Sequence, residues 1–532
     1  MFYAETVFVN GNIITMDPAC PRAQAVAVYG DRILGVGTRE ELETIIGPTT
    51  RVIDLEGHTM VPGFNDAHGH LLQYGQDSLT LEVTPERCPN IQVMKQKIAE
   101  RAAQLSPGEW LLGYGWDESR MEDGHAPNVE DLTEAAPQNP LMLIRTCYHM
   151  VAVNKMALEL GGITDSTPDP EGGKIVRDQA GIPTGLLQDN AQDFVKNIIP
   201  PMTKDKLKQC IANASKLYNK QGITSTCDAG YLGGIDCEIP GWCEAAVEGL
   251  LTVRTSTLML PETASKITEL GIPSHFGNDM FRFGCVKYIM DGSMGGGTAG
   301  MSEPYLQPHL GTGLIYMEQE ELNEKVKAAH DAGYQISIHG IGDKTIDRIL
   351  TAFEAALAAN PRPNHRHRIE HASMAYPHLL DRAKALGLTL NMNPGFLYYL
   401  GIAHIANIGD KVAYEFPMKT AMEKGIVVSA GSDRPVIDGH PKYSLFAMTQ
   451  RDTIAGQDCG KAECLTMEQA LYTYTVAGAY QTFEEDKKGM IRPGMLADFA
   501  VLSLDPTAGT PQKILDMEVL MTILGGQIVF TA

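Results

Sequence analysis

Four histidines and one aspartate could do metal chemistry in this 532-residue sequence, because each stands at the end of a predicted strand. His68 and His70 are one residue apart, and residues i and i+2 of a strand share a face, so both imidazoles can reach one ion. His339, His371 and Asp433 end three later apolar segments. One His-x-His pair alone is weak evidence for a metal site, because surface polarity or a satisfied histidine pair is its usual explanation. The five residues together predict a nitrogen- and oxygen-donor site for Zn, or less often Mn, Fe or Co.

Lys287 lies in a predicted strand that leads to Asp291, and two interpretations fit it. It could be a buried lysine that pairs with Asp291 or another acid. Alternatively, its neutral amine could take up carbon dioxide to form a carbamate, a carboxylate that can bridge two metal ions. Burial favours this reaction because it lowers a lysine pKa. The residues leave both interpretations open.

The region from 61 to 489 must position these side chains, and it alternates short apolar strands with amphipathic helices such as 204–221 and 318–333. Strands joined by helical crossovers imply a parallel sheet. Residues 141–146 also resemble a strand, and we exclude them from the barrel only because counting them would give nine strands. The remaining strands make the eight that a (β/α)8 barrel of the TIM type requires. Their predicted ends lie near His68, Asp228, Leu258, Asp291, His339, His371, Asn393 and Asp433.

Two further regions complete the predicted α/β organisation. Residues 1–60 and 490–532 hold short β-branched runs around turn signals such as Asn10-Gly11, which predicts one discontinuous β-sandwich domain flanking the barrel, 61–489. The segment 75–205 is far longer than the one helix that a crossover requires, which predicts a long insertion after barrel strand 1. Because it leaves the carboxyl end of that strand, we expect a lid that shapes substrate binding.

Composition bounds the class of protein and its partners. The formal net charge is −22, with 44% hydrophobic and 20% charged residues, and we find no run of Lys and Arg to bind nucleic acid or an anionic membrane. The ten cysteines include no Cys-x-x-Cys pair. Without a secretory signal or a membrane-spanning run, a cytoplasmic location with reduced thiols is expected. The expected partner is a small-molecule substrate, and a homodimer is a fair default.

Six motifs connect these observations to a known family: Val9-Asn-Gly-Asn-Ile-Ile-Thr-Met16, Pro62-Gly-Phe-Asn-Asp-Ala-His-Gly-His70, Asp291-Gly-Ser-Met-Gly295 with Lys287 before it, His339-Gly-Ile-Gly-Asp343, Glu370-His-Ala372 and Gly431-Ser-Asp433. In combination they resemble the amidohydrolase superfamily, specifically its amidohydrolase-3 or YtcJ-like branch. The resemblance covers nearly the whole chain. It implies a TIM-like barrel with a flanking β-sandwich, one or two divalent metal ions, and hydrolysis of C–N bonds in amide-like compounds. The branch includes deformylases of N-substituted formamides.

The resemblance also implies a role for each ligand. His68, His70 and Asp433 would hold the more buried metal ion. His339 and His371 would hold the second ion, where two are bound. Zinc is the first choice for both positions.

The implied mechanism uses two more features. A carboxylated Lys287 would bridge the two metal ions. A metal-activated hydroxide would attack a carbonyl that the second metal polarises. Asp433 would take the proton from that hydroxide and pass it to the leaving nitrogen, because an amine departs readily only once it is protonated.

Substrate contacts follow less directly from the sequence. Arg145, His149 and Asn154 lie in the insertion and resemble a family motif that faces the pocket, although Arg145 could equally form a structural salt bridge. The other candidates are Trp116, Tyr114, Arg434 and the glycine loop 295–298.

We therefore predict a metal-dependent hydrolase of C–N bonds in a small non-peptide substrate such as an amide, a formamide, an acylamine or a cyclic amide. Two alternatives remain. The same metal site could carry out another hydrolysis or an isomerisation, because fold and ligands do not dictate the bond. A non-catalytic barrel could instead serve assembly or binding, although a scaffold has no need of five ligand-type residues at strand ends.

Overall fold

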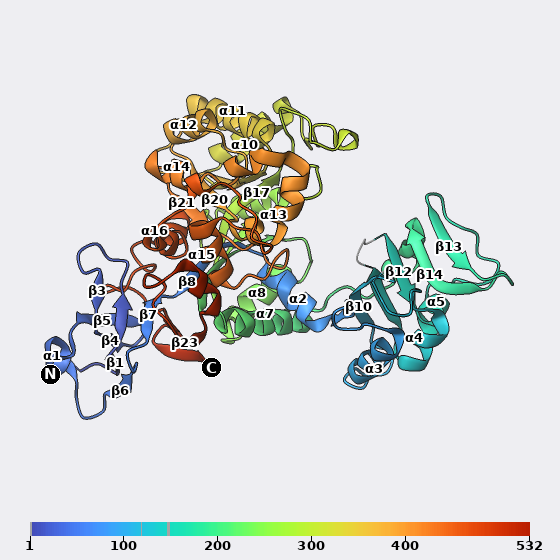
Figure 1. The fold of residues 1–532 in the computed structure, drawn as a ribbon, viewed down its shortest axis with the longest axis horizontal. Helices are drawn as coiled ribbons and strands as arrows, with labels where there is room; N and C mark the ends of the chain where they lie inside the picture. Colours follow the sequence, from blue (N-terminus) through green and yellow to red (C-terminus); the bar gives the residue numbers. More distant parts are fainter. Residues whose placement is uncertain (1–2, 119, 146–148) are drawn as a thin grey trace. The chain divides into compact units, whose positions relative to one another are not determined.

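The computed structural model describes residues 3–118, 120–145 and 149–532 (Figure 1). The chain divides into two compact units, Met1–Gly75 with Lys204–Ala532, and Gln76–Thr203. Among the residues described, no helix combines the length and apolar character that crossing a membrane requires. Nine described cysteines are free thiols, and Cys147 lies outside the described residues.

The first unit contains the barrel. Eight parallel strands form one sheet, and each strand ends at or within four residues of its predicted position, so the barrel prediction is confirmed. In spatial order the strands are β21 (Val428–Ala430), β20 (Thr389–Met392), β19 (Arg368–His371), β18 (Ile336–Gly340), β17 (Phe281–Ile289), β16 (Arg254–Met259), β15 (Ile223–Leu232) and β8 (Phe64–Gly69).

The barrel nearly closes between its first and last strands, just beyond the carboxyl ends of β8 and β21. The backbone N–H of Asp433 donates to the carbonyl of His68 at 2.7 Å, and that of His70 donates to the carbonyl of Arg434 at 2.9 Å. These two hydrogen bonds join segments more than 350 residues apart in the sequence. The residues that close the barrel are therefore the predicted metal ligands themselves or their neighbours.

Amphipathic helices cover the barrel strands (Figure 1). In α7, the buried residues Leu207, Ile211, Ala214 and Tyr218 recur at the three- and four-residue spacing that lines one helix face. The larger helices are α7 (Lys204–Asn219), α8 (Glu238–Val247), α9 (Pro261–Glu269), α10 (Gln319–Asp331), α11 (Asp343–Ala359), α12 (Pro377–Ala385), α13 (Gly395–Ile408) and α15 (Pro441–Gln450), and α14 (Met418–Glu423), α16 (Met467–Thr473) and α17 (Val476–Gln481) are shorter.

Both ends of the chain form two β-sheets in the same unit. Phe8 and Phe499, which come from opposite ends of the sequence, pack edge to face with ring centroids 5.9 Å apart. One sheet has the order β5 (Arg32–Gly37), β4 (Ala25–Tyr29), β1 (Thr6–Val9), β6 (Arg51–Asp54). The other has the order β24 (Gln527–Thr531), β23 (Val519–Leu524), β22 (Phe499–Leu502), β7 (Thr59–Pro62), β2 (Asn12–Ile14), β3 (Arg22–Ala23).

The second unit, residues 76–203, has a sheet and a core of its own. Residues 141–145 form a strand here, so leaving them out of the barrel was correct. The sheet order is β13 (Gly173–Arg177), β14 (Pro183–Asp189), β12 (Met150–Val153), β11 (Leu141–Arg145), β10 (Leu111–Trp116), β9 (Leu81–Glu82), and the helices are α3 (Ile91–Ala102), α4 (Val129–Ala135), α5 (Lys155–Leu160) and α6 (Asp193–Lys196).

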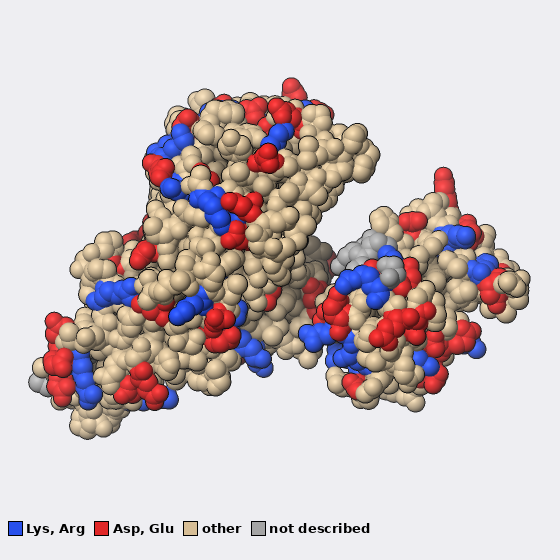
Figure 2. Space-filling view, viewed as in Figure 1, with Lys and Arg blue, Asp and Glu red and all other residues tan. Residues whose placement is uncertain are grey.

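The charged surface is mixed in sign on the face seen in Figure 2, where lysine and arginine side chains lie among aspartates and glutamates. Among the described residues, exposed ion pairs include Lys325 with Glu321 at 3.0 Å. Pairs of this kind contribute little to stability, because water screens both partners.

Candidate metal centre

Three of the predicted ligands meet at the carboxyl edge of the barrel. One candidate ligand atom from each of His68, His70 and Asp433 lies within 4.8 Å of the other two. The Nε2 atoms of His68 and His70 are 3.5 and 2.9 Å from Asp433 Oδ1. His68 and His70 come from the end of β8, and Asp433 follows β21, so the closure of the barrel brings them together. This arrangement suits a cation held by two imidazoles and a carboxylate.

The other two histidines continue the same cluster. The ring of His371 lies 4.9 Å from that of His68 and 4.3 Å from that of His339, measured between centroids. His339 and His371 stand on the neighbouring strands β18 and β19. The structure therefore brings together all five of the residues whose strand-end positions predicted a metal site.

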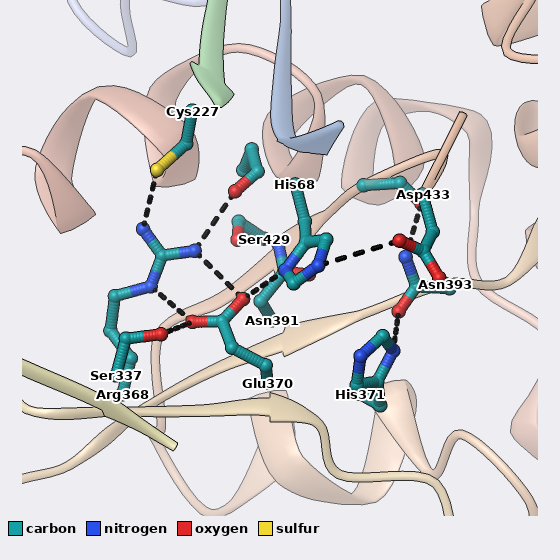
Figure 3. A network of polar contacts seen from close by, with 12 residues as sticks. His68, Cys227, Ser337, Arg368, Glu370, His371, Asn391, Asn393, Ser429 and Asp433 are labelled. Carbon is teal, nitrogen blue, oxygen red and sulfur yellow. Dashed lines mark hydrogen bonds and ion pairs between the residues drawn. The ribbon is translucent and has the colours of Figure 1, made fainter. Parts of the chain in front are cut away.

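A buried carboxylate orients His68 (Figure 3). Glu370 Oε2 accepts a hydrogen bond from His68 Nδ1 at 2.5 Å. Because Nδ1 carries the proton, the lone pair of the neutral ring lies on Nε2, which faces Asp433. A metal-binding histidine usually donates its other N–H in this way. Burial, with the nearby charge of Lys287, lowers the pKa of His68 to about 4, so the ring is held in its neutral, ligating form.

His371 and His339 donate hydrogen bonds to neutral groups, and a buried carboxylate also lies near His339. Asn393 donates from Nδ2 to the carbonyl of Gly431 at 3.1 Å, so its Oδ1 accepts from His371 Nδ1 at 2.8 Å. The lone pair of His371 is therefore on Nε2. His339 instead donates from Nε2 to the carbonyl of Gly292 at 3.0 Å, and Asp291 Oδ1 lies 3.2 Å from the same nitrogen, which leaves Nδ1 as the ligating atom of His339. The donor set fits divalent metal ions of the zinc type, with each ring held in one tautomer.

Asp433 is ionised in this setting. Burial alone would raise the pKa of its carboxyl, but the hydrogen bond with His70 and the proximity of His68 and His371 outweigh burial and lower it. Its backbone has φ of +56°, and that of His371 has φ of +66°, in the left-handed region that is uncommon for residues other than glycine, although aspartate and histidine enter it more readily than most. Local strain of this kind collects at functional sites. The carboxylate is thus available both to hold a cation and to receive a proton.

Comparisons with known proteins agree with this geometry. The family model described as "Amidohydrolase family" matches residues 51–530. The chain is 32% identical to the Bacillus subtilis amidohydrolase YtcJ, over 99% of both chains. The chain belongs to the amidohydrolase family. It is also 28% identical to the N-substituted formamide deformylase of Arthrobacter pascens, over 98% of this chain and 97% of that one.

Among solved structures, a metal-dependent hydrolase from Pyrococcus furiosus matches with a TM-score of 0.78 and 25% identity, over 94% of this chain and all of that one. The predicted resemblance and the predicted barrel are both confirmed by these matches. Membership in the amidohydrolase family makes the chain a hydrolase, as the sequence indicated.

Lys287 lies inside the barrel of this amidohydrolase and is 3% exposed. Burial lowers the pKa of its amine, although the charges of Glu370 and Asp433 oppose the shift. Ser337 lies in register with Lys287 on the adjacent strand β18, and its hydroxyl donates to Glu370 at 2.8 Å. A lowered pKa increases the neutral fraction of the amine, which is the form that reacts with carbon dioxide.

Arg434 was predicted as a substrate contact, and its side chain is almost fully buried. The guanidinium lies over the rings of Tyr74 and Tyr218, 4.5 and 4.8 Å from their centroids, and donates to Gln221. Gly439 makes room for it, because a Cβ there would lie 2.3 Å from Arg434 Nε. These contacts with protein groups explain Arg434 as a residue that packs the segment following Asp433.

Two of the candidates in the second unit have interior positions. Asn154 is fully buried, caps α5 by accepting from Ala157 N at 3.1 Å, and also bonds the backbone of Leu141, Ala136 and Asn139. Trp116 is fully buried in the core of the unit and donates to the carbonyl of Leu143 at 3.1 Å. Core packing and a helix cap thus account for both residues.

The remaining candidates are more accessible. Arg145 pairs with Asp117 at 3.0 Å and Glu118 at 2.8 Å, which is the salt-bridge alternative that the sequence left open. His149 is largely exposed and lies 3.0 Å from Asp189. Residues 146–148 of the same motif lie outside the described residues. Tyr114 stands in β10, and the 295–298 loop follows β17 in the first unit.

Several residues of the site had no role assigned from sequence, namely Glu370, Arg368, Ser337 and Asn393. Glu370 accepts from Arg368 Nε at 2.7 Å and Nη2 at 3.0 Å. Burial would raise the pKa of Glu370, but Arg368 and the hydrogen bond from His68 hold it well below its ordinary value. A charged pair inside an apolar strand, Arg368-Ile-Glu370, was the signal that could have identified Arg368 and Glu370.

Proposed function

We propose that this amidohydrolase hydrolyses a C–N bond in a small non-peptide substrate of the amide type, such as an N-substituted formamide. The observation that carries the proposal is the convergence of four histidines and Asp433 at one edge of the barrel. Similarity to YtcJ and to the N-substituted formamide deformylase supports the choice of bond.

His68, His70 and Asp433 would hold the inner metal ion, and His339 and His371 the second. Zn suits this donor set best, and Lys287, as N6-carboxylysine, would supply a bridging carboxylate. When bound, the metal supplies Lewis-acid polarisation of the carbonyl and lowers the pKa of the attacking water.

The chain's own residues have distinct tasks in the reaction. Glu370 and Asn393 hold the rings of His68 and His371 in orientation through their Nδ1 atoms. Asp433 accepts a proton from the attacking water at a carboxylate oxygen. It then delivers that proton to the leaving nitrogen, which departs as a neutral amine. The ionised state of Asp433 in the free protein suits it to the first of these steps.

The substrate assignment is tested with a panel of N-substituted formamides, other acylamines, cyclic amides, esters and phosphoesters, each incubated with zinc-loaded protein. Release of amine from an amide-type compound is the expected result. Hydrolysis of esters or phosphoesters alone would overturn the C–N assignment and favour another hydrolysis at the same site. Stable, folded protein that retains no metal would favour a non-catalytic barrel.

A further inference from the structure

Two histidines of the metal centre form Nδ1 hydrogen bonds with chemically different groups. His68 and His371 lie 4.9 Å apart, and each uses Nδ1 for a hydrogen bond to the protein. The acceptor is the carboxylate of Glu370 for His68 and the amide oxygen of Asn393 for His371 (Figure 3). The two rings therefore use the same nitrogen but have unequal partners.

Glu370 is built to remain a carboxylate. It is fully buried and accepts hydrogen bonds from both Nε and Nη2 of Arg368, from the hydroxyl of Ser337 and from His68. Four donors use about all the acceptor positions that a carboxylate offers. Arg368 also donates to the carbonyl of Ala67 at 2.9 Å, so the same charged pair fixes the backbone beside His68.

Asn393 offers no charge. Its Nδ2 is occupied by the carbonyl of Gly431, so only the neutral Oδ1 reaches His371. A hydrogen bond to a carboxylate is roughly twice as strong as one between neutral groups. It also makes the imidazole a better electron-pair donor to a metal ion.

We propose that Glu370 and Asn393 are positioning residues that give the two halves of the centre different affinities for a metal ion. The ion held by His68, His70 and Asp433 binds first. The ion at His339 and His371 binds second and more weakly. This inference rests on the metal-dependent function proposed above. It concerns only how the chain's own side chains prepare the ligands.

The test is a zinc titration of metal-stripped full-length protein in competition with a chromophoric chelator. Wild-type protein should show two binding steps of different affinity. Glu370→Gln should weaken the first step about 10- to 100-fold and leave the second unchanged. Asn393→Asp should tighten the second step and leave the first unchanged. Ser337→Ala is the matched control, because it removes one hydrogen bond from the same carboxylate without touching His68, and it should shift the first step less than Glu370→Gln does.

Wild-type affinity for the first ion in folded Glu370→Gln, or two steps of equal affinity in the wild type, would overturn the ranking while leaving the metal-dependent function standing. Absence of any tight zinc binding would overturn the proposed function as well. If Glu370→Gln does not fold, ¹⁵N NMR of histidine-labelled, metal-free wild type decides the question. A proton on His68 Nδ1 and none on Nε2 supports the role of Glu370, and the opposite tautomer refutes it.

Discussion

The barrel holds two groups of histidines, one at each end of its strands, and they differ in what their ring nitrogens contact. The group at the carboxyl edge is His68, His70, His339 and His371. The group near the amino edge is His330, His365 and His367: His365 and His367 lie just before β19, and His330 lies on α10. Each group contains a His-x-His pair, so residue type and spacing do not separate them.

At the amino edge every ring nitrogen has a hydrogen-bond partner. His367 accepts from the backbone N–H of Ile336 at Nδ1 and donates from Nε2 to His330 Nδ1 at 2.9 Å. His330 Nε2 then donates to the carbonyl of Asn360, and His365 donates to that of Leu386 while accepting from the N–H of His367. No lone pair of this relay is available to a metal ion. Its neutral rings join the starts of two barrel strands to the helices around them.

At the carboxyl edge, Glu370, Asn393 and Gly292 satisfy one nitrogen each of His68, His371 and His339. The other nitrogen of each ring is left for a ligand. These three rings at the carboxyl edge thus keep one nitrogen for a ligand, whereas the rings at the amino edge commit both nitrogens to the protein and serve as a structural element.

The largest expected effect is at the carboxyl edge. Asp433→Asn should reduce kcat/KM for the best amide substrate by about 10²- to 10⁴-fold, because the amide cannot carry the proton to the leaving nitrogen. The measurement is steady-state kinetics on zinc-loaded protein, with the thermal unfolding curve as a check on folding. Turnover within a few-fold of wild type would remove Asp433 from the proton transfer.

Zinc should stabilise the chain through one group of histidines and not the other. With free zinc at about 100 times Kd, the added free energy of unfolding should be about 2.7 kcal/mol, measured as a rise in melting temperature over chelator-treated protein. In His70→Ala this rise should be much reduced. In His365→Asn it should be unchanged, and a loss there would contradict the division into a metal site and a structural relay.

His367→Phe should break the amino-edge relay alone. Phenylalanine keeps the parallel stacking with Phe353 but leaves the N–H of Ile336 and a nitrogen of His330 unpaired. Each buried group without a partner costs about 1–3 kcal/mol of unfolding free energy. Denaturant unfolding measures the loss. The folded fraction should keep its zinc content and its kcat, whereas a selective loss of metal would show that the two edges are coupled.

Much of this arrangement could be predicted from sequence, because the barrel strands are short apolar runs and polar residues stand at their carboxyl ends, where ligands bind in such folds. His68-Gly-His70 follows such a run, whereas His365-Arg-His367 precedes one, so position along the strand distinguishes the two pairs.

The partners behind the ligands could not be predicted in the same way. Whether Glu370 reaches His68 depends on side-chain rotamers and on the register of β18 and β19, which place Ser337 opposite Arg368. The hydrophobic periodicity of the sequence predicts neither the rotamers nor the register. Asn154 likewise resembled a pocket residue by motif, and only the fold shows that its amide is used to cap α5.

The smallest expected effect tests the amino-edge relay through its acid stability. Burial is the main cause that lowers the pKa of His365 to about 4 and that of His367 well below its usual 6.5. The unfolded chain therefore binds more protons than the folded one between pH 6.5 and 4, so stability should be greatest above this window and fall as the pH is lowered through it.

His365→Asn should reduce proton uptake on unfolding by about one, which is about 1.4 kcal/mol per pH unit of slope. The readout is unfolding free energy against pH in metal-free protein. A slope equal to that of the wild type would mean that His365 is already charged in the folded chain, and the relay of neutral rings would have to be abandoned.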